Sequence, residues 1–185
     1  MKTELSSALK RLNNGQLILY PTDTVWGLGC DATNNKAIAK IFQLKKREES
    51  KSLVILVSSL TMLKEYISII PSEVLEILKA TKNPTTVIYN NPKGLAKNTI
   101  AIDNTIAIRI PKHKFCIQLI EAFGKPIVST SANISGDITP KSFSEIQQPI
   151  LDGVDYVVNL ELEKITKKSS TILKVVGDQI EVIRA

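Results

Sequence analysis

Apolar residues recur along this chain at two different periods, which predict helices and strands in alternation. Leu5, Leu9 and Leu12 lie at helical spacing before Gly15, and glycine commonly follows the last residue of a helix. A second apolar stripe with the same period follows the capping residues at 34–35. The same reasoning predicts further helices over 60–66, 72–80, 115–123, and from Ser142 onward, where Glu145 completes a capping-box signature.

Short apolar runs between these helices predict strands. Residues 53–57 are uninterrupted in their apolar character, as expected of a strand covered on both faces. Gly177-Asp178 stands between two apolar segments and signals a tight hairpin. Because strands and helices interleave throughout, we expect one α/β domain over residues 1–185 with a mixed sheet and no further domain. Strands are predicted at 17–20, 53–57, 85–89, 105–110, 126–130, 156–160, 171–176 and 179–183.

Composition narrows the class of protein. With 185 residues, 43% hydrophobic and 23% charged, the chain is typical of a soluble globular protein. It lacks the roughly 18 consecutive apolar residues of a membrane span and the apolar segment of a signal peptide, so we expect a cytoplasmic protein and no membrane partner. The net charge of +6 favours an anionic partner such as a nucleotide or RNA, but only weakly.

Histidine and cysteine are too scarce for most metal or nucleophilic sites. The single histidine, His113, excludes a multi-histidine metal site, and we expect it to be a partly exposed residue at a helix start rather than a catalytic base. Two cysteines are too few for a disulfide framework or a zinc cluster. We expect Cys30 and Cys116 to be small buried hydrophobic residues.

Three polar stretches follow apolar elements and could converge on one site. They are residues 20–29, rich in hydroxyls and glycine; residues 45–51, rich in lysine; and residues 129–136, rich in serine. Each has an alternative structural interpretation, respectively as a turn, a solvated helix end and a helix cap. Neither the phosphate-binding P-loop motif nor the dinucleotide fingerprint is present. These residues alone therefore predict a cationic, hydroxyl-rich cleft without naming its ligand.

Five stretches of the chain carry a resemblance to a known family. They are 21–28 (PTDTVWGL), 45–53 with Lys45-Lys46-Arg47 and Lys51, 108–111 (IRIP), 129–136 (STSANISG), and Ser170-Thr171 with Arg184. In this order they resemble the YrdC/TsaC-type L-threonylcarbamoyladenylate synthases over almost the whole chain. The resemblance implies a twisted mixed α/β sheet with flanking helices and a basic concave cleft.

The resemblance also implies an activity. Enzymes of this family condense ATP, L-threonine and bicarbonate into threonylcarbamoyl-AMP and release pyrophosphate. Their product passes to a transferase complex that makes N6-threonylcarbamoyladenosine in tRNA. The implied cofactor is Mg²⁺ carried by the ATP phosphates, with no protein metal ligand.

Site residues follow from the matching motifs. Lys45 and Arg47 are the expected catalytic residues, and we expect Lys45 to be a surface charge that contributes little to stability. Trp26 stands where the family usually has tyrosine, and the role of Asp23 beside anionic reactants is open. The expected ATP-binding residues are Lys45, Arg47, Lys51, Ser129, Ser131, Asn133 and Arg184; the expected threonine-binding residues are Thr22, Thr24, Thr86, Arg109 and Ser170.

Two departures from the family pattern affect loops. The family usually has Pro-Gly-Pro-x-Thr where this chain has Lys82-Asn83-Pro84-Thr85-Thr86, and the proline that normally follows Lys51 is Ser52. Two alternative functions therefore stay open. One is a YciO-like paralogue with another substrate, and the other is a double-stranded RNA-binding module, motivated by the positive charge, with shape-driven and salt-dependent binding.

Overall fold

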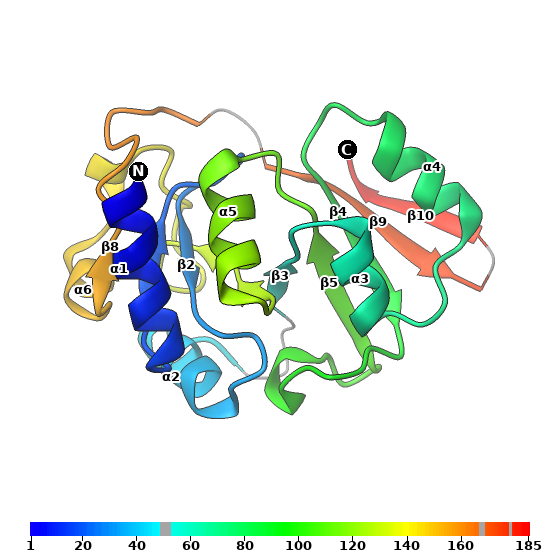
Figure 1. Cartoon of the computed structure of the whole chain (residues 1–185), viewed down its shortest axis with the longest axis horizontal. Coiled ribbons are helices and arrows are strands. Elements are labelled where there is room, and N and C mark those ends of the chain that lie inside the picture. The colour runs from blue at the N-terminus through cyan, green and yellow to red at the C-terminus, as the bar shows by residue number, and fades with distance from the viewer. Residues whose placement is uncertain (49–52, 167–168, 178) are drawn as a thin grey trace.

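The structure is a computed structural model that describes residues 1–48, 53–166, 169–177 and 179–185 (Figure 1). Its α-helices are α1 (Lys2–Asn13), α2 (Asn35–Lys45), α3 (Leu60–Tyr66), α4 (Ser72–Ala80), α5 (Lys114–Phe123) and α6 (Gln148–Asp152). Its strands are β1 (Ile18–Tyr20), β2 (Gly27–Gly29), β3 (Val54–Leu56), β4 (Thr85–Asn90), β5 (Thr105–Arg109), β6 (Ile127–Val128), β7 (Thr130–Ser131), β8 (Tyr156–Val157), β9 (Thr171–Val176) and β10 (Gln179–Arg184).

The described strands form two mixed sheets. The larger has the order β10-β9-β4-β5-β3-β6, in which β3 and β5 are parallel, as are β4 and β9. The smaller has the order β7-β2-β1-β8 and pairs β1 with β8 in parallel. The sheets meet where β6 of the larger sheet is followed, after Ser129 alone, by β7 of the smaller one. The α/β class with a mixed sheet is thus confirmed, and so is the antiparallel hairpin of β9 and β10.

Helices cover these sheets by burying the stripes that the sequence indicates. In Figure 1, α1 and α5 lie side by side, and residues such as Ala8, Leu12, Phe115 and Leu119 form one apolar cluster there. Helix α2 begins at the Asn34 cap, whose side-chain oxygen accepts hydrogen bonds from two backbone N–H groups, and it buries its own apolar stripe. No helix in the described part of the chain is long and apolar enough to cross a membrane.

The predicted helix at Ser142 is wrong. Ser142 precedes only a short 3₁₀ turn, Phe143–Glu145, and its side chain makes no capping bond. The Glu145 carboxylate accepts a hydrogen bond from the backbone N–H of Lys141 instead, at 2.8 Å. Pro149 explains why a helix does not continue from Ser142. Inside such a helix, Pro149 would have no backbone N–H to donate to the preceding turn, and its ring would clash with a carbonyl of that turn. The helix α6 therefore begins anew at Gln148, with this proline in its first turn.

His113 lies at the start of α5, as expected, but it is buried rather than partly exposed. Its side chain is covered by the segment that carries Glu161, and His113 Nε2 lies 3.0 Å from Glu161 Oε1. Cys116, one turn along α5, is fully buried and donates its thiol hydrogen to the carbonyl of Pro21. Cys30 is buried as well, so both cysteines are the buried small residues that the sequence predicts.

Candidate functional site

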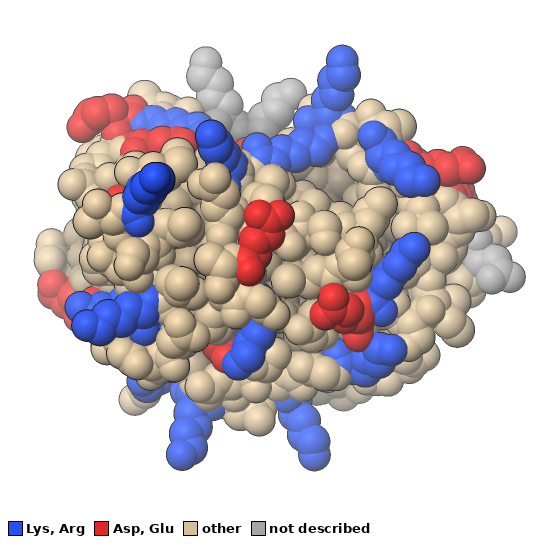
Figure 2. All heavy atoms as spheres, in the orientation of Figure 1, with Lys and Arg blue, Asp and Glu red and all other residues tan. Residues whose placement is uncertain are grey.

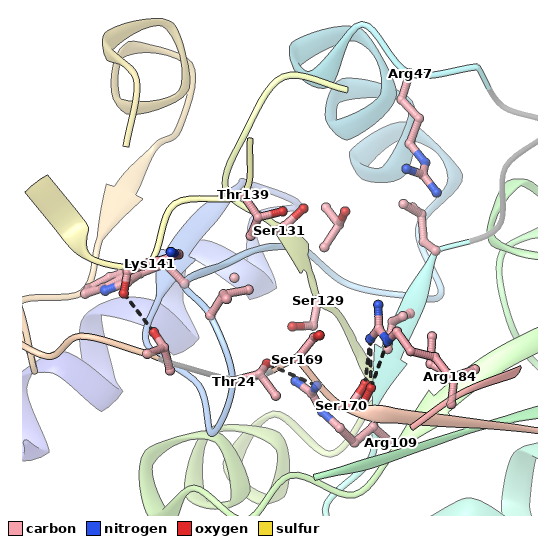
Figure 3. Close-up of a pocket in the computed structure, with 18 residues that line it drawn as sticks. Thr24, Arg47, Arg109, Ser129, Ser131, Thr139, Lys141, Ser169, Ser170 and Arg184 are labelled. Atoms are coloured by element: carbon pink, nitrogen blue, oxygen red, sulfur yellow. Dashed lines mark hydrogen bonds between the residues drawn. The ribbon is translucent and has the colours of Figure 1, made fainter. Parts of the chain in front are cut away.

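A pocket of about 500 Å³ opens where the two sheets meet (Figure 3). The smaller sheet supplies residues from β2 and β7 and from the loop before β2, while the larger sheet supplies residues from β3, β5, β9 and β10. Thr139, Lys141, Thr166, Ser169 and Ser170, which lie outside the strands, complete the rim. The lining residues are Thr24, Val25, Trp26, Gly27, Arg47, Leu53, Val54, Arg109, Ser129, Thr130, Ser131, Thr139, Lys141, Thr166, Ser169, Ser170, Ile172 and Arg184.

One side of the pocket is a wall of paired polar groups, which we call the hydroxyl wall: Thr22, Asp23, Thr24 and Arg109. The Thr22 and Thr24 hydroxyl oxygens lie 3.1 Å apart, and Arg109 Nη1 donates to Thr24 Oγ1 at 3.1 Å. Arg109 Nη2 lies 3.4 Å from Asp23 Oδ1, and both side chains are 6% exposed. The wall is therefore preformed, because buried charges are stable only when paired.

Asp23 does not face the pocket as an unpaired carboxylate. Besides its ion pair with Arg109, its Oδ2 accepts a hydrogen bond from the backbone N–H of Lys112 at 2.9 Å. This carboxylate thus neutralises a buried guanidinium and fixes its orientation. The question that the sequence leaves open about Asp23 is answered by a structural hydrogen-bonding role.

A second cluster lies at the end of the larger sheet. Thr86 Oγ1 and Ser170 Oγ are 2.9 Å apart in the interior, across the parallel pair β4 and β9. Arg184, on β10, donates to the Ser170 carbonyl from Nε at 3.1 Å and from Nη2 at 2.8 Å. These contacts fix the guanidinium of Arg184 at the pocket wall, as the close-up shows (Figure 3).

Lys45 is buried, with 1% of its surface exposed, so the expectation of a surface charge is wrong. It lies at the end of α2, and its ammonium group donates to the carbonyls of Ser131 and Asn133, both at 2.5 Å. Burial, and secondarily the positive charge of Arg47, lower its pKa to about 8. Lys45 therefore ties α2 to the loop that follows β7.

The loop that follows β7 is also held by its own side chains. Asn133 Nδ2 donates to the carbonyls of Ile134 and Asp137, each at 2.9 Å, and the backbone N–H of Ser135 donates to the Lys45 carbonyl. These bonds fold the loop back on itself, so that Ser131 and Thr139 both line the pocket. Asn133 itself is buried behind them.

Two glycines let β2 approach its neighbours closely. A Cβ atom on Gly29 would lie 2.3 Å from the Val128 carbonyl oxygen and 2.7 Å from Tyr20 Cε1. A Cβ atom on Gly27 would meet the Ser129 hydroxyl at 3.0 Å. The glycines of the stretch 20–29 therefore serve close packing beside the pocket.

Most of the predicted site residues converge. Thr24, Arg47, Arg109, Ser129, Ser131, Ser170 and Arg184 all line the pocket. Four further predicted residues lie directly behind it, each hydrogen-bonded to a lining residue or its backbone: Thr22, Lys45, Thr86 and Asn133. Lys51 lies outside the residues that the structure describes. Whether each residue contacts ATP or threonine stays a prediction.

The predicted site residues lacked five polar lining residues: Thr130, which lies within the stretch 129–136, and Thr139, Lys141, Thr166 and Ser169. Thr139 and Lys141 follow the stretch 129–136 by a few positions, and this proximity was the available signal. Ser169 adjoins the predicted Ser170. Thr166 gives no signal in the sequence, since it reaches the rim through two hydrogen bonds to the Lys141 carbonyl, from its N–H at 2.8 Å and from its hydroxyl at 3.0 Å.

The fold and the pocket together define an α/β protein with a polar pocket between two mixed sheets. The family model of the Sua5, YciO and YrdC proteins, described as "Telomere recombination", matches residues 10–185. The chain belongs to this family.

Curated relatives agree with that membership. The chain is 32% identical to a threonylcarbamoyl-AMP synthase of Pseudoalteromonas translucida over 91% of this chain and 92% of the relative. It is 33% identical to a putative threonylcarbamoyl-AMP synthase of Methanocaldococcus jannaschii over 99% of this chain and 86% of the relative. These relatives match along most of their length.

Solved structures share the fold. P. abyssi Sua5 complexed with L-threonine superposes with a TM-score of 0.88 at 25% identity, covering 100% of this chain and 54% of that chain. This chain therefore spans about half the length of that Sua5 chain. E. coli YciO superposes with a TM-score of 0.86 at 23% identity, covering 100% of this chain and 89% of that chain, which shows a common fold.

Proposed function

We propose that this chain is a threonylcarbamoyl-AMP synthase that condenses ATP, L-threonine and bicarbonate. The observation that carries the proposal is the pocket itself, in which a preformed hydroxyl wall with Arg109 faces cationic side chains across about 500 Å³. Curated relatives with the synthase name match this chain over nine-tenths of its length. Threonine and ATP are accordingly the two substrates that the comparisons support best.

The chemistry asks for alignment and charge neutralisation. In the proposed reaction the threonine amine attacks the bicarbonate carbon, water leaves, and a carbamate forms. A carbamate oxygen then attacks the α-phosphorus of ATP while the bond to pyrophosphate breaks. Because these partners are anions, catalysis depends on holding them in line and on offsetting their charge.

The pocket residues suit these tasks. The hydroxyl wall offers Thr24 and Arg109 to the threonine carboxylate and hydroxyl, with Ser129 and Ser170 beside the reacting carbamate. Arg47, Ser131 and Arg184 face the nucleotide. In this proposal Lys45 does not contact the substrates. Its ammonium group binds the carbonyls of Ser131 and Asn133 and thereby positions the part of the pocket that faces the nucleotide.

Mg²⁺ is proposed to enter with ATP. Among the described lining residues none is a carboxylate, while serine and threonine hydroxyls are abundant. Mg²⁺ typically keeps several waters and binds substrate phosphates, so this donor set fits a metal held mainly by the triphosphate. The ion would offset phosphate charge, and the side chains would orient the phosphates around it.

Partners beyond the small substrates are also part of the proposal. The product would pass to a transferase complex that modifies tRNA. Direct RNA binding receives little support from the visible face, where lysine and arginine side chains are scattered rather than gathered over one area (Figure 2). A double-stranded RNA-binding module would need such an area to follow the phosphates.

The test is an assay of pyrophosphate release. Purified protein is incubated with ATP, Mg²⁺, L-threonine and bicarbonate, and the adenylate product is identified by mass spectrometry. Omitting threonine or bicarbonate, one at a time, should abolish both signals. Pyrophosphate released equally without threonine would replace the proposal by a YciO-like paralogue with another substrate. No pyrophosphate together with salt-dependent binding of duplex RNA would favour the RNA-binding alternative.

A further inference from the structure

Lys141 is a pocket residue to which none of the motif matches assigns a role. It lies on the loop that follows β7, and in Figure 3 it stands across the pocket from Arg47 and Arg184. Its side chain is exposed, so it sits at the rim rather than in the interior. The pocket is thus bordered by positive charge on two opposite sides.

The charges around the pocket differ in their partners. Arg109 is paired with Asp23, and Arg184 is bound to Ser170. The Lys141 ammonium group, by contrast, makes no ion pair or hydrogen bond with any described residue, although the Glu145 carboxylate accepts the Lys141 backbone N–H. None of the described lining residues is acidic, so no carboxylate in the lining offsets the charge of Lys141. That charge therefore attracts an anion that enters the pocket.

Main-chain contacts hold this position independently of the side chain. The Lys141 carbonyl accepts both hydrogen bonds from Thr166, and its N–H is bound to Glu145. Replacing the side chain leaves these three bonds available. A change at Lys141 therefore tests its charge without removing the contacts that order the rim.

We propose that Lys141 binds the polyphosphate of the nucleotide. It thereby strengthens the binding of ATP and leaves the binding of the zwitterionic substrate, L-threonine, almost unchanged. This inference deepens the proposed synthase function and rests on it. A lysine ammonium group is a compact charge that can donate hydrogen bonds to phosphate oxygens from a flexible stem. L-Threonine carries no net charge at neutral pH, so its binding depends on the hydroxyl wall and responds little to a rim cation.

The experiment compares Lys141→Met, Lys141→Arg and the control Lys79→Met, which removes the same charge from an exposed position on α4. Lys141→Met should raise the KM for ATP about tenfold, the size expected of one charge-assisted hydrogen bond, and weaken product inhibition by pyrophosphate in parallel. The KM for threonine should change less than about twofold, as typical of a contact that threonine does not make, and Lys141→Arg should retain most ATP affinity. Raising the salt concentration should weaken ATP binding less in Lys141→Met than in wild type.

A binding measurement separates this inference from the synthase proposal. Trp26 is the only tryptophan and lines the pocket, so its fluorescence should report ATP binding without turnover. If wild type binds ATP but releases no threonine-dependent pyrophosphate, the synthase proposal fails, while the Lys141→Met titration still tests Lys141. Equal ATP affinities of Lys141→Met and Lys79→Met would overturn the role of Lys141. An equal rise in both KM values, or a lowered unfolding midpoint, would also overturn it by showing a structural role.

Discussion

The two sides of the pocket satisfy their polar groups in different ways. In the hydroxyl wall, Arg109, Asp23 and Thr24 are buried or nearly so and are bound to one another. Away from this wall, Arg47 is half-buried on one side of the pocket, and Lys141 is exposed at the rim on the side across from it. A preformed wall can orient a small substrate without reorganising, whereas the exposed ammonium group of Lys141 keeps its hydration until an anion arrives. The difference indicates that the hydroxyl wall recognises the shape of a small substrate, while the cations on the other sides of the pocket recognise negative charge.

The largest expected effect comes from breaking the hydroxyl wall. Arg109→Met leaves Asp23 as a buried carboxylate without its cation, and removing one partner of such a pair typically costs about 3–5 kcal/mol. Urea unfolding of the variant and of wild type would measure this loss of stability. Threonine-dependent turnover should fall as well, because the guanidinium lines the pocket.

The double variant Asp23→Asn/Arg109→Met separates the two consequences. Removing both charges together should recover most of the stability, since no unpaired buried charge remains. Turnover should stay low, because Arg109 is still absent. Recovery of turnover in the double variant would show that activity requires only that the hydroxyl wall carry no unpaired charge. The role of Arg109 in orienting the substrate would then have to be abandoned.

The next effect concerns β2, the strand beside the wall. Gly29→Ala places a Cβ against the Val128 carbonyl and the Tyr20 ring, and overpacking of this kind costs about 1–3 kcal/mol. In the matched variant Gly27→Ala the Cβ would lie 3.0 Å from the Ser129 hydroxyl, 3.2 Å from the Thr22 methyl group and 3.3 Å from the Tyr20 ring. These approaches are less close than those at Gly29, so the variant should destabilise less, while its added methyl group lies beside the pocket. Thermal unfolding and turnover of both variants would check that Gly29→Ala lowers stability more and Gly27→Ala lowers activity more.

The last effect depends on pH and concerns Lys45, which lies behind the pocket. Burial lowers the pKa of Lys45 from 10.5 to about 8, so between these values the unfolded chain binds a proton that the folded chain does not. The stability of wild type relative to Lys45→Met should therefore rise with pH in this window, by about 1.4 kcal/mol per pH unit, and level off on either side.

Urea unfolding of wild type and Lys45→Met from pH 7 to pH 11 measures that difference. Lys46→Met is the matched control, because it removes the same charge from an exposed neighbouring position. A flat difference for Lys45→Met across the window would show that the pKa of Lys45 is not lowered in the folded chain, and the pH dependence expected from its burial would have to be abandoned.

Local patterns in the sequence predicted most elements of the fold. The stripe behind Asn34 and the apolar run at 53–57 each fix an element through short-range spacing, and the structure confirms a helix and a strand there. The helix expected at Ser142 failed, because Pro149 excludes the continuation that the capping pattern promised. The capping-box pattern spans only the four residues from Ser142 to Glu145, so it takes no account of a proline seven positions after Ser142.

The sequence predicted which residues form the site better than it predicted how those residues are arranged. The matching motifs identified seven lining residues, since chemistry-bearing side chains recur in recognisable stretches. They did not reveal that Lys45 points into the interior or that Asp23 is paired with Arg109. Burial and pairing arise from long-range packing, which no local spacing encodes. Lys141 and Thr166 were missed for the same reason, because a contact between distant loops brings them together.

Arg184 also has a consequence for the order in which the protein acquires activity. The pocket runs from Thr24 to Arg184, and the last of these residues is fixed only when β10 has paired with β9. A ribosome releases the chain from the N-terminus onward, so a nascent chain can complete its smaller sheet, whose last strand is β8, before β10 is available to the pocket. The pocket wall that Arg184 supplies is therefore complete only after β10 has emerged and paired with β9.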